Sequence, residues 1–567
     1  MLELTPSKLM DELRASERLR DAHLEIILKL VAAYHGRFFS SELQDGDPKP
    51  KNHNYEYISL ILAQIVYENP ECSVESMSPA ISNGSEKAIQ HGVNRWAKQI
   101  NLRRKLVTVA HDMLFGFGVL QTYLSPDRAN QQLAIPQCKR IAPHRFIRDH
   151  RAIFMDDGER YSGHMWLKDK ADLLKNPKFN PDVVESIAKD AGLDAALPKG
   201  KAKGPSRGEI VGYDIWVPEV TPEGYGEPEY NGSIYTLAYG VTPDGDATEA
   251  KWLRDPRPYF GPRCGPYTLF GVHVVPDQAY PLSPLAAVFE QTKEHNAHAA
   301  AAARDAAARK KFLGFDSSNQ EAGRAAKMVK NGEVVGLPDL QKGAVQQFEL
   351  GGVSPQQYEY LQYLQDQVDR VSGLNEAMRG NITGDPTATE VSAAQSGSSV
   401  RVETIRSQFR DSVKQVMTTA GFLMNYSEHV QLPLGPQAAK ELGMVNPVLL
   451  GGIHENEDPR AFNDFEFVVD PYSMPYTSDV VLQKRGQDTL ALVAQYMPMV
   501  AQFPTFPWGE FFDDIGQMLN NNNLGSYFEA FIANQQQMMA QQAAMMPPPP
   551  MGGPTDPGAV QQQAVMA

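Results

Sequence analysis

The chain has 567 residues, which exceeds one ordinary domain and allows a large buried core. Hydrophobic residues make up 42% of it and charged residues 21%, a balance that is normal for a soluble globular protein. No apolar run approaches the ~18 residues that span a bilayer, and the N-terminal stretch MLELTPSKLMDELRASERLRD is charged rather than a signal peptide. We therefore expect that the protein does not associate with a membrane. We expect it to assemble in the cytoplasm.

The formal net charge is −15, from 53 basic and 68 acidic residues. Such a chain is an unlikely tight binder of nucleic acid, because affinity for a duplex comes largely from Lys and Arg that neutralise phosphates. Cys72, Cys138 and Cys264 are far apart and form no C-x-x-C motif. This spacing argues against a zinc site or a disulfide framework and predicts buried free thiols.

The first half of the chain predicts a helix-rich α+β fold. Helical patterns cover residues 5–37, 55–68 and 85–114, and the last of these should bury Trp96, Ile100, Leu102 and Leu106. Segments with β-branched and aromatic residues, bounded by Gly, Pro and Asp, then predict strands near 119–124, 132–140, 161–167, 209–217, 228–239 and 267–275.

A long helix should begin at Ser283-Pro284, with Ser283 as the N-cap and proline at the first helical position. It continues to about Lys311 without Gly or Pro, which corresponds to about 42 Å of helix. The sequence then changes character over residues 312–353, where we expect a short helix and strands at 333–336 and 345–350.

A second helix should open at Ser354-Pro355 and extend over 354–379. Its apolar residues recur at steps of three and four and predict one packed stripe, namely Tyr358, Leu361, Leu364, Val368 and Val371. The two glycines and the proline of Gly380–Pro386 cannot continue a helix and predict a mobile loop. Thr387 and Glu390 then have the spacing of a capping box for a third helix, which carries an apolar ladder of Val402, Ile405, Phe409, Val413 and Val416.

Beyond the third helix, residues 426–477 contain short strand-like segments, and the pattern becomes helical again over 478–533. Residues 534–567 are rich in Gln, Met and Pro, and no pattern there could bury a core. We expect this tail to be disordered.

This succession of a long helix, a small α/β insert, a returning helix, a short loop and a capped TATEV helix resembles tailed-bacteriophage portal proteins, the head-to-tail connectors. The stretches FGFGVLQTYL, RYSGHMWLKDKADLLKN and AYPLSPLAAVFEQTKEHN are similar in order and character to the wing of that family. The resemblance covers roughly residues 50–480. It implies a wing (1–283), stem helices (284–311 and 354–379), a clip (312–353), a tunnel loop (380–386), a wing helix with return strands (387–477) and a crown (478–533).

The resemblance also implies a function. Identical subunits, twelve in that family, would form a ring at one capsid vertex of the virion, through which double-stranded DNA is packaged and ejected without sequence specificity. The expected partners are the terminase large subunit, head-tail adaptor and tail proteins, and the major capsid and scaffolding proteins. The implied DNA-facing residues are Gly380, Asn381, Ile382, Thr383, Gly384 and Asp385, and the implied clip contacts to terminase or adaptor are Lys327, Lys330, Glu333 and Lys342.

Two alternatives stay open from the sequence. Clustered carboxylates can hold Mg²⁺, so Asp149, Asp156 and Asp157 near His150 and Arg151 could serve a metal-dependent nuclease, although a polar turn is the simpler interpretation. The chain could also be a minor head protein that forms no pore.

Other catalytic signals are weak. The sequence contains no G-x-x-x-x-G-K-[ST], so it lacks the phosphate-binding loop of a P-loop ATPase. His295 and His298 lie one helical turn apart, but no third metal ligand is near them in the sequence. We expect no enzymatic activity, no cofactor and no bound metal.

Overall fold

The chain divides into two units, residues 1–476 and 477–567, and every helix and strand with defined bounds lies in the first unit. None of the described helices is both long and apolar enough to cross a membrane. The computed structural model describes residues 5–36, 51–76, 83–127, 132–152, 159–191, 209–218, 231–242, 247–259, 261–315, 345–350, 352–373, 388–451 and 465–471, with the single positions 462, 473, 474, 491, 495 and 511.

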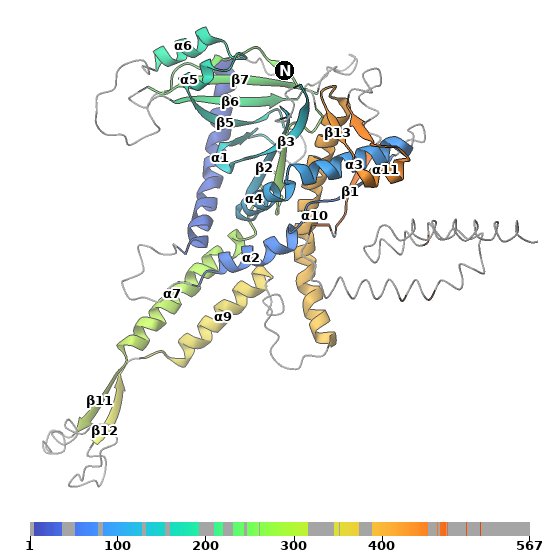
Figure 1. Cartoon of the computed structure of the whole chain (residues 1–567). Helices are drawn as coiled ribbons and strands as arrows, with labels where there is room; N and C mark the ends of the chain where they lie inside the picture. Colours follow the sequence, from blue (N-terminus) through green and yellow to red (C-terminus); the bar gives the residue numbers. More distant parts are fainter. Residues whose placement is uncertain are drawn as a thin grey trace, which may run out of the picture. The chain divides into compact units, whose positions relative to one another are not determined.

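Four helices open the chain, as Figure 1 shows: α1 (Pro6–Tyr34), α2 (His53–Ile65), α3 (Asn83–Gln99) and α4 (Leu102–Phe115). Thr5 caps α1 by accepting a hydrogen bond from the backbone N–H of Lys8, and Asn52 caps α2 in the same way. The single helix expected over 85–114 is instead two helices. They separate because Asn101 adopts a left-handed conformation with φ of 50°, which asparagine tolerates better than most residues. The predicted core residues Trp96, Leu102 and Leu106 are fully buried.

The predicted strands form two antiparallel sheets, which confirms the α+β class. A three-stranded sheet has the order β10 (Tyr267–Gly271), β2 (Phe117–Pro126), β3 (Ala134–Ile141). A six-stranded sheet follows the order β4 (Phe146–Arg148), β5 (Ser162–Asp169), β6 (Glu209–Val217), β7 (Ser233–Gly240), β8 (Lys251–Trp252), with β9 (Arg257–Pro258) also paired to β7. The single turn η1 (Pro143–Arg145) leads from the smaller sheet into the larger one.

Each face of the larger sheet has its own cover. On one face, α1 contributes Leu9 and Leu13 to a cluster with Tyr213 and Ile215 of β6. On the other face, α5 (Lys170–Leu174) and α6 (Pro181–Asp190) contribute Leu173, Val184 and Ile187 to a cluster with Trp166 and Ala238.

The longest helix, α10 (Ala388–Tyr426), runs through the main core, where its predicted ladder from Val402 to Val416 is fully or almost fully buried. The predicted cap at Thr387 lies outside the described residues. Short strand pairs flank this helix: β1 (Cys72–Ser76) pairs with β15 (Phe465–Val469), and β13 (Gln431–Pro433) pairs with β14 (Val448–Leu450), with α11 (Pro436–Leu442) between the last two.

The predicted pair of long helices is α7 (Ala286–Ala308) and α9 (Pro355–Ser372), and Figure 1 shows them side by side. Between them, β11 (Lys310–Phe315) and β12 (Val345–Leu350) form an antiparallel ribbon. In its register, Lys310 is paired with Leu350 and Phe315 with Val345. We call these four elements the hairpin, and the other described elements of the first unit the body. The prediction of a strand at 345–350 is confirmed.

The helix ends were predicted with unequal success. Helix α9 begins as expected, because Ser354 and Gln357 form a reciprocal capping box ahead of Pro355. Helix α7 begins two residues later than the Ser283-Pro284 signal indicated and ends before Lys311. The Ser283 hydroxyl donates to the carbonyl oxygen of Leu114 at 2.7 Å, which attaches the chain to α4, and it accepts from the backbone N–H of Leu285 at 3.1 Å, just before α7 begins.

The cysteine prediction was correct for two of the three residues. Cys72 and Cys138 are buried, and this burial raises the pKa of Cys72 to about 12 and that of Cys138 to about 11. Cys264 is exposed, contrary to expectation, because it lies in the turn that precedes β10.

Candidate functional site

The hairpin is held together by a narrow apolar seam and a few polar contacts. In α9, Leu364 and Val368 are buried. Tyr360 donates a hydrogen bond to Glu294 at 2.6 Å, and its ring lies edge-on to the ring of His298 with centroids 5.1 Å apart. These contacts align α7 with α9 over most of their length.

The outer faces of α9 carry large side chains that nothing in the described chain covers. Tyr358 is 60% exposed and Tyr363 is 55% exposed, and Val371 is also exposed. We expected Tyr358 and Val371 to pack in the same stripe as Leu364, and for the single chain this is wrong. Among the described helices, α9 packs along α7, and α7 covers only one side of it.

A joint of reciprocal hydrogen bonds connects the hairpin to the body. The buried side chain of Asn296 on α7 accepts from the backbone N–H of Lys51 and donates to its carbonyl oxygen, both at 3.1 Å. The ammonium group of Lys51 donates to Gln365 of α9 at 2.9 Å, so this one residue contacts both hairpin helices. Next to it, the rings of His53 and His295 are in edge contact.

A second joint lies at the C-terminal end of α9. The guanidinium of Arg401 on α10 donates to the carbonyl oxygens of Arg370 and Val371, at 2.9 and 2.8 Å. A cation is favourable at the C-terminus of a helix, where carbonyl groups lack intrahelical partners. Gly373, with φ of +76°, ends α9 in the left-handed conformation at this point.

The predicted interaction residues lie outside the described part of the chain. This is true of the tunnel loop from Gly380 to Asp385 and of the clip residues Lys327, Lys330, Glu333 and Lys342. Their roles stay predictions, as do the crown, the tail and the division into wing, stem and clip.

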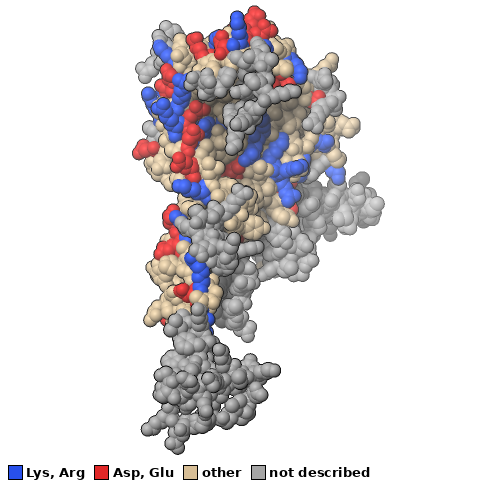
Figure 2. All heavy atoms as spheres, turned by 90° about the vertical axis from the view of Figure 1, so that its left-hand side faces the viewer, with Lys and Arg blue, Asp and Glu red and all other residues tan. Residues whose placement is uncertain are grey.

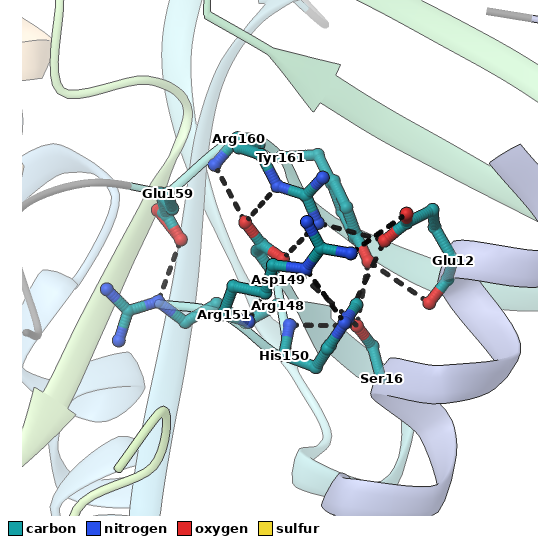
Figure 3. Close-up of polar contacts among 9 residues, drawn as sticks. All are labelled: Glu12, Ser16, Arg148, Asp149, His150, Arg151, Glu159, Arg160 and Tyr161. Atoms are coloured by element: carbon teal, nitrogen blue, oxygen red, sulfur yellow. Dashed lines mark hydrogen bonds and ion pairs between the residues drawn. The ribbon is translucent and has the colours of Figure 1, made fainter. Parts of the chain in front are cut away.

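The acidic group considered for a nuclease is part of a network that joins α1 to the larger sheet (Figure 3). Asp149 follows β4 and is fully buried, and Glu12 and Ser16 approach it from α1. The guanidinium of Arg160 bonds both oxygens of Asp149 at 2.9 Å and Glu12 at 2.8 Å. Burial raises the pKa of Asp149, but hydrogen bonds from the Arg160 side chain and from the backbone of Arg151 and Arg160 outweigh it and hold the pKa below its usual range.

Ligand atoms of Glu12, Asp149 and His150 are close enough to one another to share a metal ion. Arg160, however, already bridges the two carboxylates, and a cation could enter only by displacing a paired guanidinium. The group is therefore better suited to fasten α1 than to activate water. Asp156 and Asp157, the other carboxylates of the nuclease hypothesis, lie outside the described residues.

The two histidines on α7 diverge. His295 faces His53 of α2, and burial lowers its pKa. His298 is half exposed and faces Tyr360 of α9. Among the described residues, the group whose ligand atoms could share a metal ion is that of Glu12, Asp149 and His150, and neither histidine of α7 belongs to it.

No family model matches the chain, and no curated protein matches it. A chain of the solved structure described as "Virion of native gene transfer agent (GTA) particle" is similar to it at 13% identity and a TM-score of 0.30. The match covers 79% of this chain and 92% of that chain. At this identity and TM-score, the similarity supports no statement about function or partners.

Proposed function

We propose that copies of this chain assemble into a portal-type ring at one capsid vertex of a virion, and that double-stranded DNA passes through the ring during packaging and ejection. The proposal starts from the order of elements in the sequence, which resembles that of portal proteins. The paired helices α7 and α9, joined through a strand ribbon and followed by the long α10, are the arrangement that this order requires.

The observation that carries the proposal is the exposure of α9. Two apolar side chains of this helix, Leu364 and Val368, are buried by the chain itself, whereas Tyr358, Tyr363 and Val371 face outward. Tyr363 stacks on the exposed ring of Tyr360, and large exposed apolar side chains that lie together commonly mark an interface. Identical neighbours in a ring would cover them by a heterologous contact that closes on itself.

The charges of the hairpin also suit passage of DNA. Acidic residues such as Glu290 and Glu359 alternate with basic residues such as Lys293 and Arg370, and Figure 2 shows both signs along this part of the chain. Tight binding to a duplex needs many phosphate contacts from Lys and Arg. A wall of mixed sign would guide DNA without retaining it.

By this proposal the chain is not an enzyme, and the ATPase that drives packaging is a separate terminase protein. Docking of terminase and later of a head-tail adaptor would fall to the clip, at residues 312–353. The pairing of Asp149 with Arg160 favours this interpretation over a metal-dependent nuclease.

Sedimentation of the purified full chain tests the proposal. We expect one dominant species of about twelve times the 62.8 kDa chain mass. Replacing Tyr358 and Tyr363 by serine should shift the distribution toward smaller species, because each replacement removes apolar area from the subunit contact. The matched control replaces Tyr55 and Tyr123, two exposed tyrosines of the body, and should keep the large species. A wild-type chain that stays monomeric at all concentrations would overturn the proposal.

A further inference from the structure

Three exposed basic side chains gather where the two sheets meet. Lys139 on β3, Arg145 at the end of η1 and Lys168 on β5 are all exposed, and none forms an ion pair with another described residue. All three act electrostatically on the same buried residue, His164. They therefore surround one point of the fold although they come from three different elements.

The strand register explains this convergence. His164 of β5 lies opposite Asp214 of β6, which lies opposite Thr236 of β7. Because side chains two apart on a strand share a face, Trp166 and Lys168 follow His164 on the same side of the sheet. The Tyr267 hydroxyl of β10 lies 2.8 Å from Nδ1 of His164, which brings the smaller sheet against this face.

Asp214, the acidic group that acts on both His164 and Lys139, is already engaged. Asp214 accepts a hydrogen bond from the Thr236 hydroxyl at 2.6 Å and lies 3.4 Å from the guanidinium of Arg254. Its single charge acts on both Lys139 and Arg254. The chain as a whole is acidic, so this local excess of positive charge is not a consequence of composition.

Aromatic rings support two of the cations. The ammonium group of Lys168 lies 5.0 Å from the ring centre of Trp166, and the guanidinium of Arg254 lies 5.7 Å from that of Phe179. Such contacts hold a cation by its attraction to the ring. The guanidinium of Arg254 also donates to the Thr236 hydroxyl at 2.8 Å, so it is already engaged within the fold. Trp166 itself is only 7% exposed, so the surface offers charge rather than an apolar pocket.

The cations also repel one another. Partial burial lowers the pKa of Lys139, the positive charges of Lys168 and Arg145 lower it further, and the charge of Asp214 opposes them. Bringing an anion to the cluster would relieve this repulsion. Figure 2 shows basic side chains predominating on the right-hand half of the body in that view.

We propose that Lys139, Arg145 and Lys168 bind backbone phosphates of double-stranded DNA. Phosphate contacts require cationic hydrogen-bond donors but no contact with the edges of the bases. The cluster offers such donors. This surface belongs to the body rather than to the hairpin, so the inference goes beyond the proposed channel. It holds for a single subunit whether or not a ring forms.

Fluorescence anisotropy of a labelled 30-base-pair duplex, titrated with the full chain at several salt concentrations, tests the proposal. Replacing the three cations (K139Q, R145Q and K168Q) should lower the slope of log affinity against log salt by about 2.7, at about 0.9 for each lost phosphate contact. At low salt the affinity should fall on the order of 100-fold. A matched control, K29Q, K87Q and K440Q, removes the same charge from three other exposed positions and should change the slope by less than about 1.

Two further measurements distinguish phosphate binding at this cluster from a loss of folding or of net charge. All three replaced residues are exposed, so the circular dichroism spectrum and the melting temperature should match those of the control variant. Equal loss of affinity in both triple variants would mean that only net charge matters and would overturn the proposal. It would also be overturned if the cluster bound inorganic phosphate or polyglutamate but no duplex.

Discussion

Replacing Arg160 by leucine should lower the free energy of unfolding by about 3 to 5 kcal/mol, which is the cost of removing one partner from a buried ion pair. Asp149 is fully buried and receives two of its hydrogen bonds from the Arg160 guanidinium, which also bonds Glu12 of α1 (Figure 3). The variant leaves the Asp149 charge with backbone N–H donors alone. Urea denaturation, followed by the circular dichroism of the helices, measures the change.

Two further variants make this result specific. Arg14→Leu removes an exposed arginine of α1 whose ion pair with Asp11 is 3.7 Å long, and it should change stability by less than about 1 kcal/mol. Removing Asp149 together with Arg160 should restore part of the loss, because no buried charge is then left unpaired. If Arg160→Leu is no more destabilising than Arg14→Leu, the network does not fasten α1 to the sheet.

Acid should destabilise the body through His164. Burial, assisted by the positive charges of Lys139, Lys168 and Arg145, lowers the pKa of His164 to about 4, against an ordinary value of 6.5, although Asp214 opposes the shift. Between these values the unfolded chain binds a proton that the folded chain does not. The free energy of unfolding should therefore fall as the pH drops from about 6.5 to about 4, by about 3 kcal/mol from this residue.

The difference between two pH profiles isolates this contribution, because carboxyl groups also titrate in the same range. His164→Gln keeps a polar group near the Tyr267 hydroxyl and cannot gain a proton, so its profile should be flatter than that of the wild type between pH 6.5 and 4. His298→Gln, which alters a half-exposed histidine of α7, should leave the profile unchanged. Parallel profiles for the wild type and His164→Gln would refute the assignment.

The features predicted well from sequence are those that depend on local signals. Ser354 and Gln357 satisfy each other's backbone within one turn, so the start of α9 could be read directly from the sequence. The ladder of α10 was predicted because helical periodicity places Val402, Ile405 and Phe409 on one face, and these residues are buried.

The features predicted poorly depend on contacts between distant segments. Ser283 accepts from the backbone N–H of Leu285, as a cap would, but its hydroxyl also donates to Leu114, 169 residues away, a contact that has no local signal. The sequence likewise shows Asp149 in a polar turn without indicating that Glu12 and Arg160 neutralise it. The cluster around Lys139 and Lys168 was missed for the same reason, since the strand register that brings them together has no local signature.

Electron-microscopic imaging of the purified full chain tests the proposed portal function most directly. We predict rings with an axial hole, in which α7 and α9 of each subunit surround the hole and Tyr358 and Tyr363 are covered by neighbouring subunits. Particles without a hole, or rings in which these two helices lie on the outer rim with both tyrosines exposed, would contradict the portal function.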